Sequence, residues 1–249
     1  MPQPQKILLT IAYDGTAYHG WQRQNGQITV QEEVENGLTK LFNTPITIRG
    51  ASRTDAGVHA LGQRATFDIA TTIPMASLPL AINNGLPRDI RVVKAQVVPE
   101  DFHPQYDAKG KTYSYKIYNK AITNPMLRNY TWLVKPTLDV ATMHKAAQEL
   151  VGYHNFLSFC AAGGSAKTFE REIYAISVTT STDPHVIEIK VTGNGFLYNM
   201  VRIIAGTLAY IGYGKIDASQ LGAILKAQDR TLAGITAEAQ GLTLVEIEY

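Results

Sequence analysis

Cysteine is nearly absent from this sequence, which has one, Cys160, among 249 residues. A single cysteine cannot form an internal disulfide or a CxxC metal site, so we expect a reducing, cytoplasmic environment and a small buried side chain at this position. Charged residues make up only 18% of the chain, and the formal net charge is +2. The low charge content therefore excludes a highly charged disordered protein, and the small net charge does not by itself indicate a nucleic-acid-binding protein.

Long apolar runs are missing as well. The longest, at 200–214, is interrupted by Arg202 and falls short of the roughly 18 apolar residues of a membrane span. The first residues lack the pattern of a secretory signal peptide, so we expect no membrane contact and no export.

Several common catalytic motifs are also missing, namely the GxSxG elbow, HExxH, the Walker A loop and the EF-hand loop. The six histidines are scattered along the chain. Asp55 and His59 are the one closely spaced pair of potential metal ligands, and a metal site needs more than two. We therefore expect no metal.

In the first half, apolar periodicity and turn residues predict the order strand, helix, strand, strand, helix, strand. Thr29 and Glu32 form a capping-box pattern at the start of the first helix. The strands are expected at 7–13, 46–49, 63–69 and 92–98, and the helices at 30–42 and from 77 onward.

The second half repeats this order without visible sequence similarity. Strands are expected at 111–118, 172–180, 185–192 and 242–249, and helices at 140–151, 198–211 and 217–226. These elements predict an α+β fold of two ferredoxin-like βαββαβ units, residues 1–104 and 105–249. We expect their mostly antiparallel sheets to join, with an active-site cleft between the units.

The segment from Arg53 to His59, Arg-Thr-Asp-Ala-Gly-Val-His, lies in a predicted loop between strands. Thr-Asp-Ala-Gly is ordinary turn chemistry, and the segment taken alone favours a structural role. However, a loop between rigid strands can hold a carboxylate at a cleft, and the nearby Arg53 favours its ionised form. Asp55 is therefore a candidate catalytic carboxylate.

A basic and aromatic stretch spans 105–120, where lysines alternate with tyrosines. Such interleaving suits an RNA backbone and stacked bases. The alternative is an amphipathic strand with a solvated lysine face, and the stretch alone favours that interpretation. The residues are Lys109, Lys111, Lys116 and Lys120 with Tyr106, Tyr113, Tyr115 and Tyr118.

Five segments spread over the whole chain form a larger pattern. They are Tyr13–Gln24, Ala51–Ala60, Lys111–Tyr115, Gly195–Arg202 and Gly241–Leu244. In this order they resemble the N-terminal segment, the aspartate loop, the tyrosine strand, the arginine motif and the C-terminal strand of the tRNA pseudouridine synthase A family. The resemblance is therefore more specific than any single motif.

The resemblance implies an enzyme that isomerises uridine to pseudouridine at positions 38–40 of the tRNA anticodon stem-loop, without a cofactor. It implies that Asp55 is the catalytic carboxylate acting on a flipped-out uridine and that Arg202 pairs with it. Tyr113 would stack on the uracil, Leu244 would line the pocket, and Arg53 would fill the vacated space or hold a phosphate.

On the same basis, Arg23, Arg64, Lys109 and Lys111 are expected to face RNA. The implied partners are tRNA and a second copy of the chain in a homodimer, with no other protein partner. Two alternatives remain open from the residues. One is a non-catalytic RNA-binding module, and the other is a hydrolase of glycosidic bonds, which usually needs a second acid.

Overall fold

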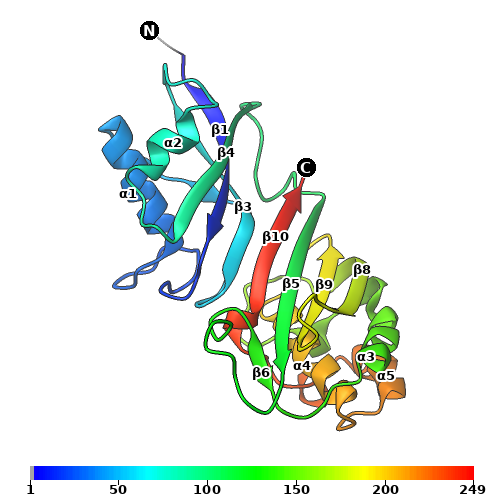
Figure 1. The fold of residues 1–249 in the computed structure, drawn as a ribbon. Helices are drawn as coiled ribbons and strands as arrows, with labels where there is room; N and C mark the ends of the chain where they lie inside the picture. Colours follow the sequence, from blue (N-terminus) through cyan, green and yellow to red (C-terminus); the bar gives the residue numbers. More distant parts are fainter. Residues whose placement is uncertain (1–2) are drawn as a thin grey trace. The chain divides into compact units, whose positions relative to one another are not determined.

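The computed structural model describes residues 3–249, which divide into two compact units (Figure 1). The first unit holds the chain up to Lys109 together with Leu244–Tyr249, and the second holds Gly110–Thr243. The predicted division after residue 104 differs from this grouping, because it assigns the whole last strand to the second half.

The first unit is built on a sheet with the strand order β4-β1-β3-β10, in which β4, β1 and β3 run antiparallel and β10 is the last strand of the chain (Leu242–Glu248). The central strand β1 (Gln5–Tyr13) pairs with β3 (His59–Ile69) and β4 (Ile90–Val98), and β2 (Arg49–Gly50) pairs with β3. Helices α1 (Val30–Phe42) and α2 (Leu78–Asn83) lie on one side of these strands (Figure 1). This is the predicted ferredoxin-like order.

The apolar residues that predicted these elements form the core of the first unit. Ile7, Leu9 and Ile11 of β1 are fully buried, as are Val34 and Leu38 of α1. The Thr29 hydroxyl accepts a hydrogen bond from the Glu32 backbone N–H at 3.4 Å, which confirms the Thr29 half of the predicted capping box at the start of α1.

The second unit has the antiparallel order β5-β9-β8-β7, with β6 parallel to β5. Helix α3 packs on β8 and on α4, and α4 also contacts β5. The strands are β5 (Gly110–Asn119), β6 (Trp132–Val134), β7 (Gly152–Asn155), β8 (Glu170–Thr180) and β9 (Val186–Gly193). The helices are α3 (Val140–Ala147), α4 (Met200–Gly212) and α5 (Leu221–Ala227), with 3-10 turns at Gln148–Leu150, Leu157–Phe159, Ala218–Gln220, Arg230–Leu232 and Ala239–Gly241.

The α+β class and the mostly antiparallel pairing are confirmed, whereas the joining of the two sheets and a cleft between the units stay predictions. The predicted burial of Cys160 is also confirmed. Within 3–249, no helix is both long and apolar enough to span a membrane.

The predicted strand at 46–49 is wrong, since only Arg49–Gly50 is a strand. The backbone N–H groups of Ile46 and Ile48 instead donate to Thr39 Oγ1 at 3.2 Å and Glu35 Oε1 at 3.0 Å, so side chains of α1 take the place of a neighbouring strand. Strands β6 and β7 were not predicted, because three or four residues are too few to show alternation.

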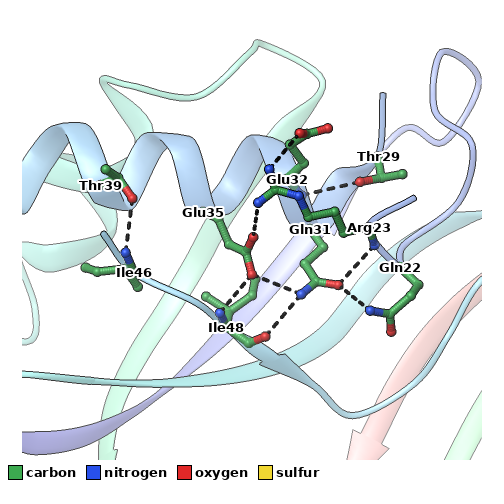
Figure 2. A network of polar contacts seen from close by, with 9 residues as sticks. All are labelled: Gln22, Arg23, Thr29, Gln31, Glu32, Glu35, Thr39, Ile46 and Ile48. Atoms are coloured by element: carbon green, nitrogen blue, oxygen red, sulfur yellow. Dashed lines mark hydrogen bonds and ion pairs between the residues drawn. The ribbon is translucent and has the colours of Figure 1, made fainter. Parts of the chain in front are cut away.

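Glu35 lies at the centre of a polar network under α1 (Figure 2). Its side chain is nearly buried, and besides Ile48 it accepts hydrogen bonds from Gln31 Nε2 at 2.9 Å and Arg23 Nη1 at 3.2 Å. Gln31 Oε1 in turn accepts from Gln22 Nε2 at 3.0 Å and from the Arg23 backbone N–H at 3.1 Å. The network ties the helix to the segments before and after it.

Replacing Glu35 by Ala should lower the free energy of unfolding of the first unit by about 3 kcal/mol, because three donors lose their buried acceptor. Urea unfolding followed by hydrogen exchange at Val34 and Leu38 would measure the loss. Asn36→Ala, at an exposed position of the same helix, is the control and should change stability by less than about 0.5 kcal/mol. Equal effects of the two substitutions would contradict the role of Glu35.

Candidate active site

The loop that carries Arg53 and Asp55 connects β2 to β3. It is fastened at its start, because the Ala51 N–H donates to the Arg64 carbonyl at 2.8 Å and Gln63 Nε2 donates to the Ser52 carbonyl at 2.7 Å. It closes in a turn in which the Val58 N–H donates to the Asp55 carbonyl at 3.1 Å. The backbone of Asp55 is thus part of a fixed turn.

The segment Tyr13–Gln24 holds the middle of this loop through Thr54. The Trp21 N–H donates to the Thr54 carbonyl at 3.0 Å, and the Tyr13 hydroxyl and Thr54 Oγ1 share a buried hydrogen bond of 2.7 Å. After Asp55, the Gly57 N–H donates to the Tyr18 carbonyl at 3.2 Å. Residues on both sides of Asp55 are therefore bonded to the same segment.

Two glycines allow this close approach. Gly20 has a φ of +83°, and a Cβ there would lie 2.4 Å from the Thr54 carbonyl oxygen. A Cβ at Gly15 would lie 2.0 Å from the Val58 carbonyl oxygen. Any larger residue at either position would push the segment away from the loop.

His59 follows the loop and is buried. Its Nδ1 accepts a hydrogen bond from the Gly15 N–H at 3.0 Å and lies 3.2 Å from Asp14 Oδ1. These contacts tie it to the segment before α1. Among residues 3–249, no group of three or more His, Cys, Asp and Glu residues is placed to bind a metal ion.

Tyr113 lies on β5 in the second unit, opposite Val191 of β9. Only 6% of its surface is exposed. Its ring meets the Phe196 ring edge to face, with centroids 5.1 Å apart and an interplanar angle of 82°. Phe196 belongs to the segment Gly195–Arg202, so two of the five resembling segments meet at this tyrosine.

Arg202 lies in the first turn of α4. Its Nε donates to the Ala237 carbonyl at 2.7 Å and its Nη1 donates to Asn199 Oδ1 at 2.7 Å. The Arg202 charge also reaches Tyr115, whose pKa is raised by burial and partly lowered again by the guanidinium. This arginine is therefore held by its own unit in one orientation.

The predicted site residues fall in both units. Arg53, Asp55 and Leu244 belong to the first unit, and Tyr113 and Arg202 to the second. Leu244, on β10, is fully buried. The predicted pairing of Asp55 with Arg202 stays a prediction, and so do the roles of all five residues.

The predicted RNA-facing residues differ in their surroundings. Arg23 forms ion pairs with Glu32 at 3.1 Å and Glu35 at 3.2 Å, which offset its charge. Arg64 donates from Nη1 to Thr10 Oγ1 at 2.5 Å, and its buried Nε has no hydrogen-bond partner among the described residues. Lys109 is exposed, whereas Lys111 is partly buried. Burial and the nearby Arg171 charge lower the pKa of Lys111 to about 8.

A family model described as tRNA pseudouridine synthase matches residues 9–107 and 146–249 of this chain. The chain belongs to that family. It is therefore an isomerase that converts uridine in tRNA to pseudouridine, and the family match agrees with the resemblance carried by the five segments.

Close relatives of this synthase cover its whole length. A tRNA pseudouridine synthase A of Ruminiclostridium cellulolyticum is 51% identical over 98% of this chain and 100% of its own. One of Thermoanaerobacter sp. is 46% identical with the same coverage, and one of Syntrophotalea carbinolica is 42% identical over 98% of this chain and 96% of its own.

A chain in the crystal structure of a Cbf5-Nop10-Gar1 complex matches 95% of the synthase and 57% of its own length at 9% identity, with a TM-score of 0.35, which is too low to support an argument.

The sequence of the synthase did not reveal which residues hold the aspartate loop. Tyr13, Gly15, Gly20 and Trp21 all lie in a segment that the resemblance had singled out, but neither periodicity nor spacing pairs it with Thr54. That contact joins residues 41 positions apart, from Tyr13 to Thr54. Only the fold brings them together.

Tyr13→Phe and Thr54→Val remove the same hydrogen bond in the synthase and retain the side-chain shapes. We expect each to lower kcat for uridine isomerisation about fivefold, because a buried bond of roughly 1 kcal/mol orients the loop. The double variant should be no slower than either single variant. Tyr106→Phe, at an exposed tyrosine, is the control and should keep full activity. If the double variant instead lost activity by the product of the two single factors, the two side chains would not act through one hydrogen bond.

The lowered pKa of Lys111 is testable directly. A lysine resonance of the synthase should titrate with a midpoint near 8 and disappear in Lys111→Met. Because the folded-state pKa lies below the unfolded one, the unfolded chain binds more protons above pH 8, and stability should rise with pH relative to the variant until the unfolded lysine also loses its proton. A midpoint near that of ordinary lysines, or a fall in relative stability, would contradict the burial of the charge.

Proposed function

We propose that this synthase modifies uridines at positions 38–40 of the tRNA anticodon stem-loop, with the Asp55 carboxylate acting on a flipped-out uridine. The assignment of Asp55 is supported by the hydrogen bonds on both sides of it. Thr54 before it and Gly57 after it are both hydrogen-bonded to the segment Tyr13–Gln24. A catalytic group must be held in place in this way to act at one atom of a bound substrate. The stem-loop positions rest on the resemblance.

The isomerisation breaks the bond from C1′ to N1 of the uracil, rotates the base and forms a bond from C1′ to C5. The hydrogen on C5 leaves as a proton, and N1 ends with a proton, so atoms balance without oxidation or hydrolysis. An ionised carboxylate can start this sequence as a nucleophile or as a base. The proposed role of Asp55 includes both possibilities.

The second unit supplies two other proposed groups, Tyr113 and Arg202, and the first unit supplies Leu244. Tyr113 presents an aromatic ring against Phe196 that can stack on the uracil, and its hydroxyl can take the C5 proton. Arg202, oriented by Asn199 and Ala237, would keep Asp55 ionised. Leu244 would give the base an apolar surface. These roles require the two units to present one common site to the RNA.

The target uridine has to leave its stack before Asp55 can reach it, which costs a few kcal/mol. Contacts with the RNA backbone would offset this free energy of unstacking. Arg53 and Lys109 are exposed and suited to it, whereas Arg23 and Arg64 are already bonded to protein groups. We therefore propose that Arg53 occupies the space of the flipped base or binds a phosphate.

We also propose that the synthase works as a homodimer in the cytoplasm. The dimer rests on the resemblance and on the small net charge, because a tRNA lying across two copies can contact two basic regions. The location rests on the tRNA substrate and on the single cysteine. Analytical ultracentrifugation at micromolar concentration would reveal a monomer if the dimer proposal is wrong.

Asp55→Asn should abolish tritium release from tRNA labelled at uracil C5, with a loss of at least about 1000-fold relative to the wild-type enzyme, because an amide is neither a nucleophile nor a base. Asp68→Asn, at an exposed aspartate of β3, is the matched control and should keep full activity. Mapping the product by primer extension would identify the modified positions.

The outcomes distinguish the alternatives. Full activity of Asp55→Asn would overturn the proposed role of this residue. RNA binding without tritium release by the wild-type enzyme would favour a binding module, and free uracil among the products would favour a hydrolase. Modification confined to positions outside 38–40 would refute the proposed specificity.

A further inference from the structure

The residues 234–238 have no regular secondary structure and lie between the 3-10 turns Arg230–Leu232 and Ala239–Gly241. In this segment Ala237, which is fully buried, makes two hydrogen bonds with Arg202. The Arg202 Nε donates to the Ala237 carbonyl at 2.7 Å, and the Ala237 N–H donates to the Arg202 carbonyl at 3.2 Å. A displacement of Ala237 would therefore change the direction of the guanidinium.

The two bonds that orient the Arg202 guanidinium depend on different parts of the chain. Asn199 Oδ1 accepts from Nη1 and is only three positions away, at the start of the same helix. The Ala237 carbonyl is 35 positions away, in a segment without a helix or strand to fix it. The second bond therefore depends on the contacts that hold the segment 234–238.

Tyr115 of β5 holds this segment at the next residue. Its hydroxyl donates to the Glu238 carbonyl at 2.8 Å, and the bond joins positions 123 residues apart. The bond is made to the main chain of Glu238, whose carboxylate accepts from Gln240 Nε2. Tyr115 is fully buried, and burial raises its pKa although the Arg202 charge partly lowers it again. The hydroxyl therefore stays protonated and remains a donor.

The Tyr115 ring is closely packed against its surroundings. A Cβ at Gly241 would lie 2.6 Å from the Tyr115 Cζ and 2.9 Å from its hydroxyl oxygen, so the ring lies directly against the main chain after Glu238. The Trp132 ring meets it edge to face, with centroids 6.3 Å apart. The hydroxyl is thus aimed at one carbonyl, and phenylalanine at this position would retain the packing while losing the bond.

We infer that Tyr115 is a positioning residue for Arg202. Its hydroxyl fixes the main chain at Glu238, and the adjacent Ala237 carbonyl then fixes the Arg202 guanidinium. The inference rests on the proposed function, since it takes Arg202 to act on Asp55. An arginine side chain has many rotamers, and holding it in one of them before RNA binds avoids the entropy cost of ordering it during the reaction.

Tyr115→Phe tests the position of Arg202 directly. The nuclear magnetic resonance signal of the Arg202 Nε–H, assigned by its loss in Arg202→Gln, should exchange with solvent about fivefold faster in Tyr115→Phe than in the wild-type enzyme, because one buried hydrogen bond is lost. Tyr118→Phe is the matched control, since Tyr118 is buried on the other face of the same strand, beside His185. It should leave the exchange rate unchanged. A wild-type exchange rate in Tyr115→Phe, or equal acceleration in both variants, would overturn the inference.

Kinetics with tRNA test the consequence for the reaction. Tyr115→Phe should lower kcat about fivefold and change KM less than twofold, because a guanidinium that acts on the reacting groups contributes in the transition state more than in binding. Tyr118→Phe should resemble the wild-type enzyme. If exchange is faster but kcat is unchanged, and Arg202→Gln also keeps full activity, the proposed role of Arg202 is overturned, whereas its positioning by Tyr115 stands. If Arg202→Gln loses activity and Tyr115→Phe keeps the wild-type kcat, the inference is overturned.

Discussion

The hydrogen bond between the Tyr13 hydroxyl and Thr54 Oγ1 is the contact on which the position of the aspartate loop depends. It joins the end of the central strand to the residue before Asp55. Backbone hydrogen bonds from Trp21 and Tyr18 also hold the aspartate loop. They can form because Gly15 and Gly20, which have no side chains, allow the two segments to approach closely. A short carboxylate side chain on a loop has few ways to be positioned, and here its neighbours on both sides are fixed by one segment.

The second unit uses a different solution. Its proposed site residues lie on regular elements, Tyr113 on a strand and Arg202 on a helix, and each is contacted by the segment 195–202 or its neighbours. Side chains on strands and helices are positioned more precisely than side chains on loops. The loop of the first unit lacks this rigidity and depends on the residues before α1 to replace it.

The sequence predicted the long elements well because their apolar residues recur with the period of a helix or a strand. It failed where side chains replaced strand partners, as at Ile46 and Ile48, and where strands were too short to show a period. For the proposed site, Asp55, Tyr113 and Arg202 could be named from segments of a known family, whereas the contacts that hold the aspartate loop could not. The bond from Tyr13 to Thr54 joins residues 41 positions apart, which no spacing along the chain reveals.

The grouping of Leu244–Tyr249 with the first unit affects how the chain acquires its structure during synthesis. The Lys109 N–H donates to the Glu248 carbonyl at 2.9 Å, and the Tyr249 hydroxyl donates to the Pro104 carbonyl at 2.7 Å. These bonds cannot form until the ribosome has translated all of Gly110–Thr243. The unit that carries the aspartate loop therefore finishes folding last, although its first strand is made first, and such non-local pairing is expected to be slow.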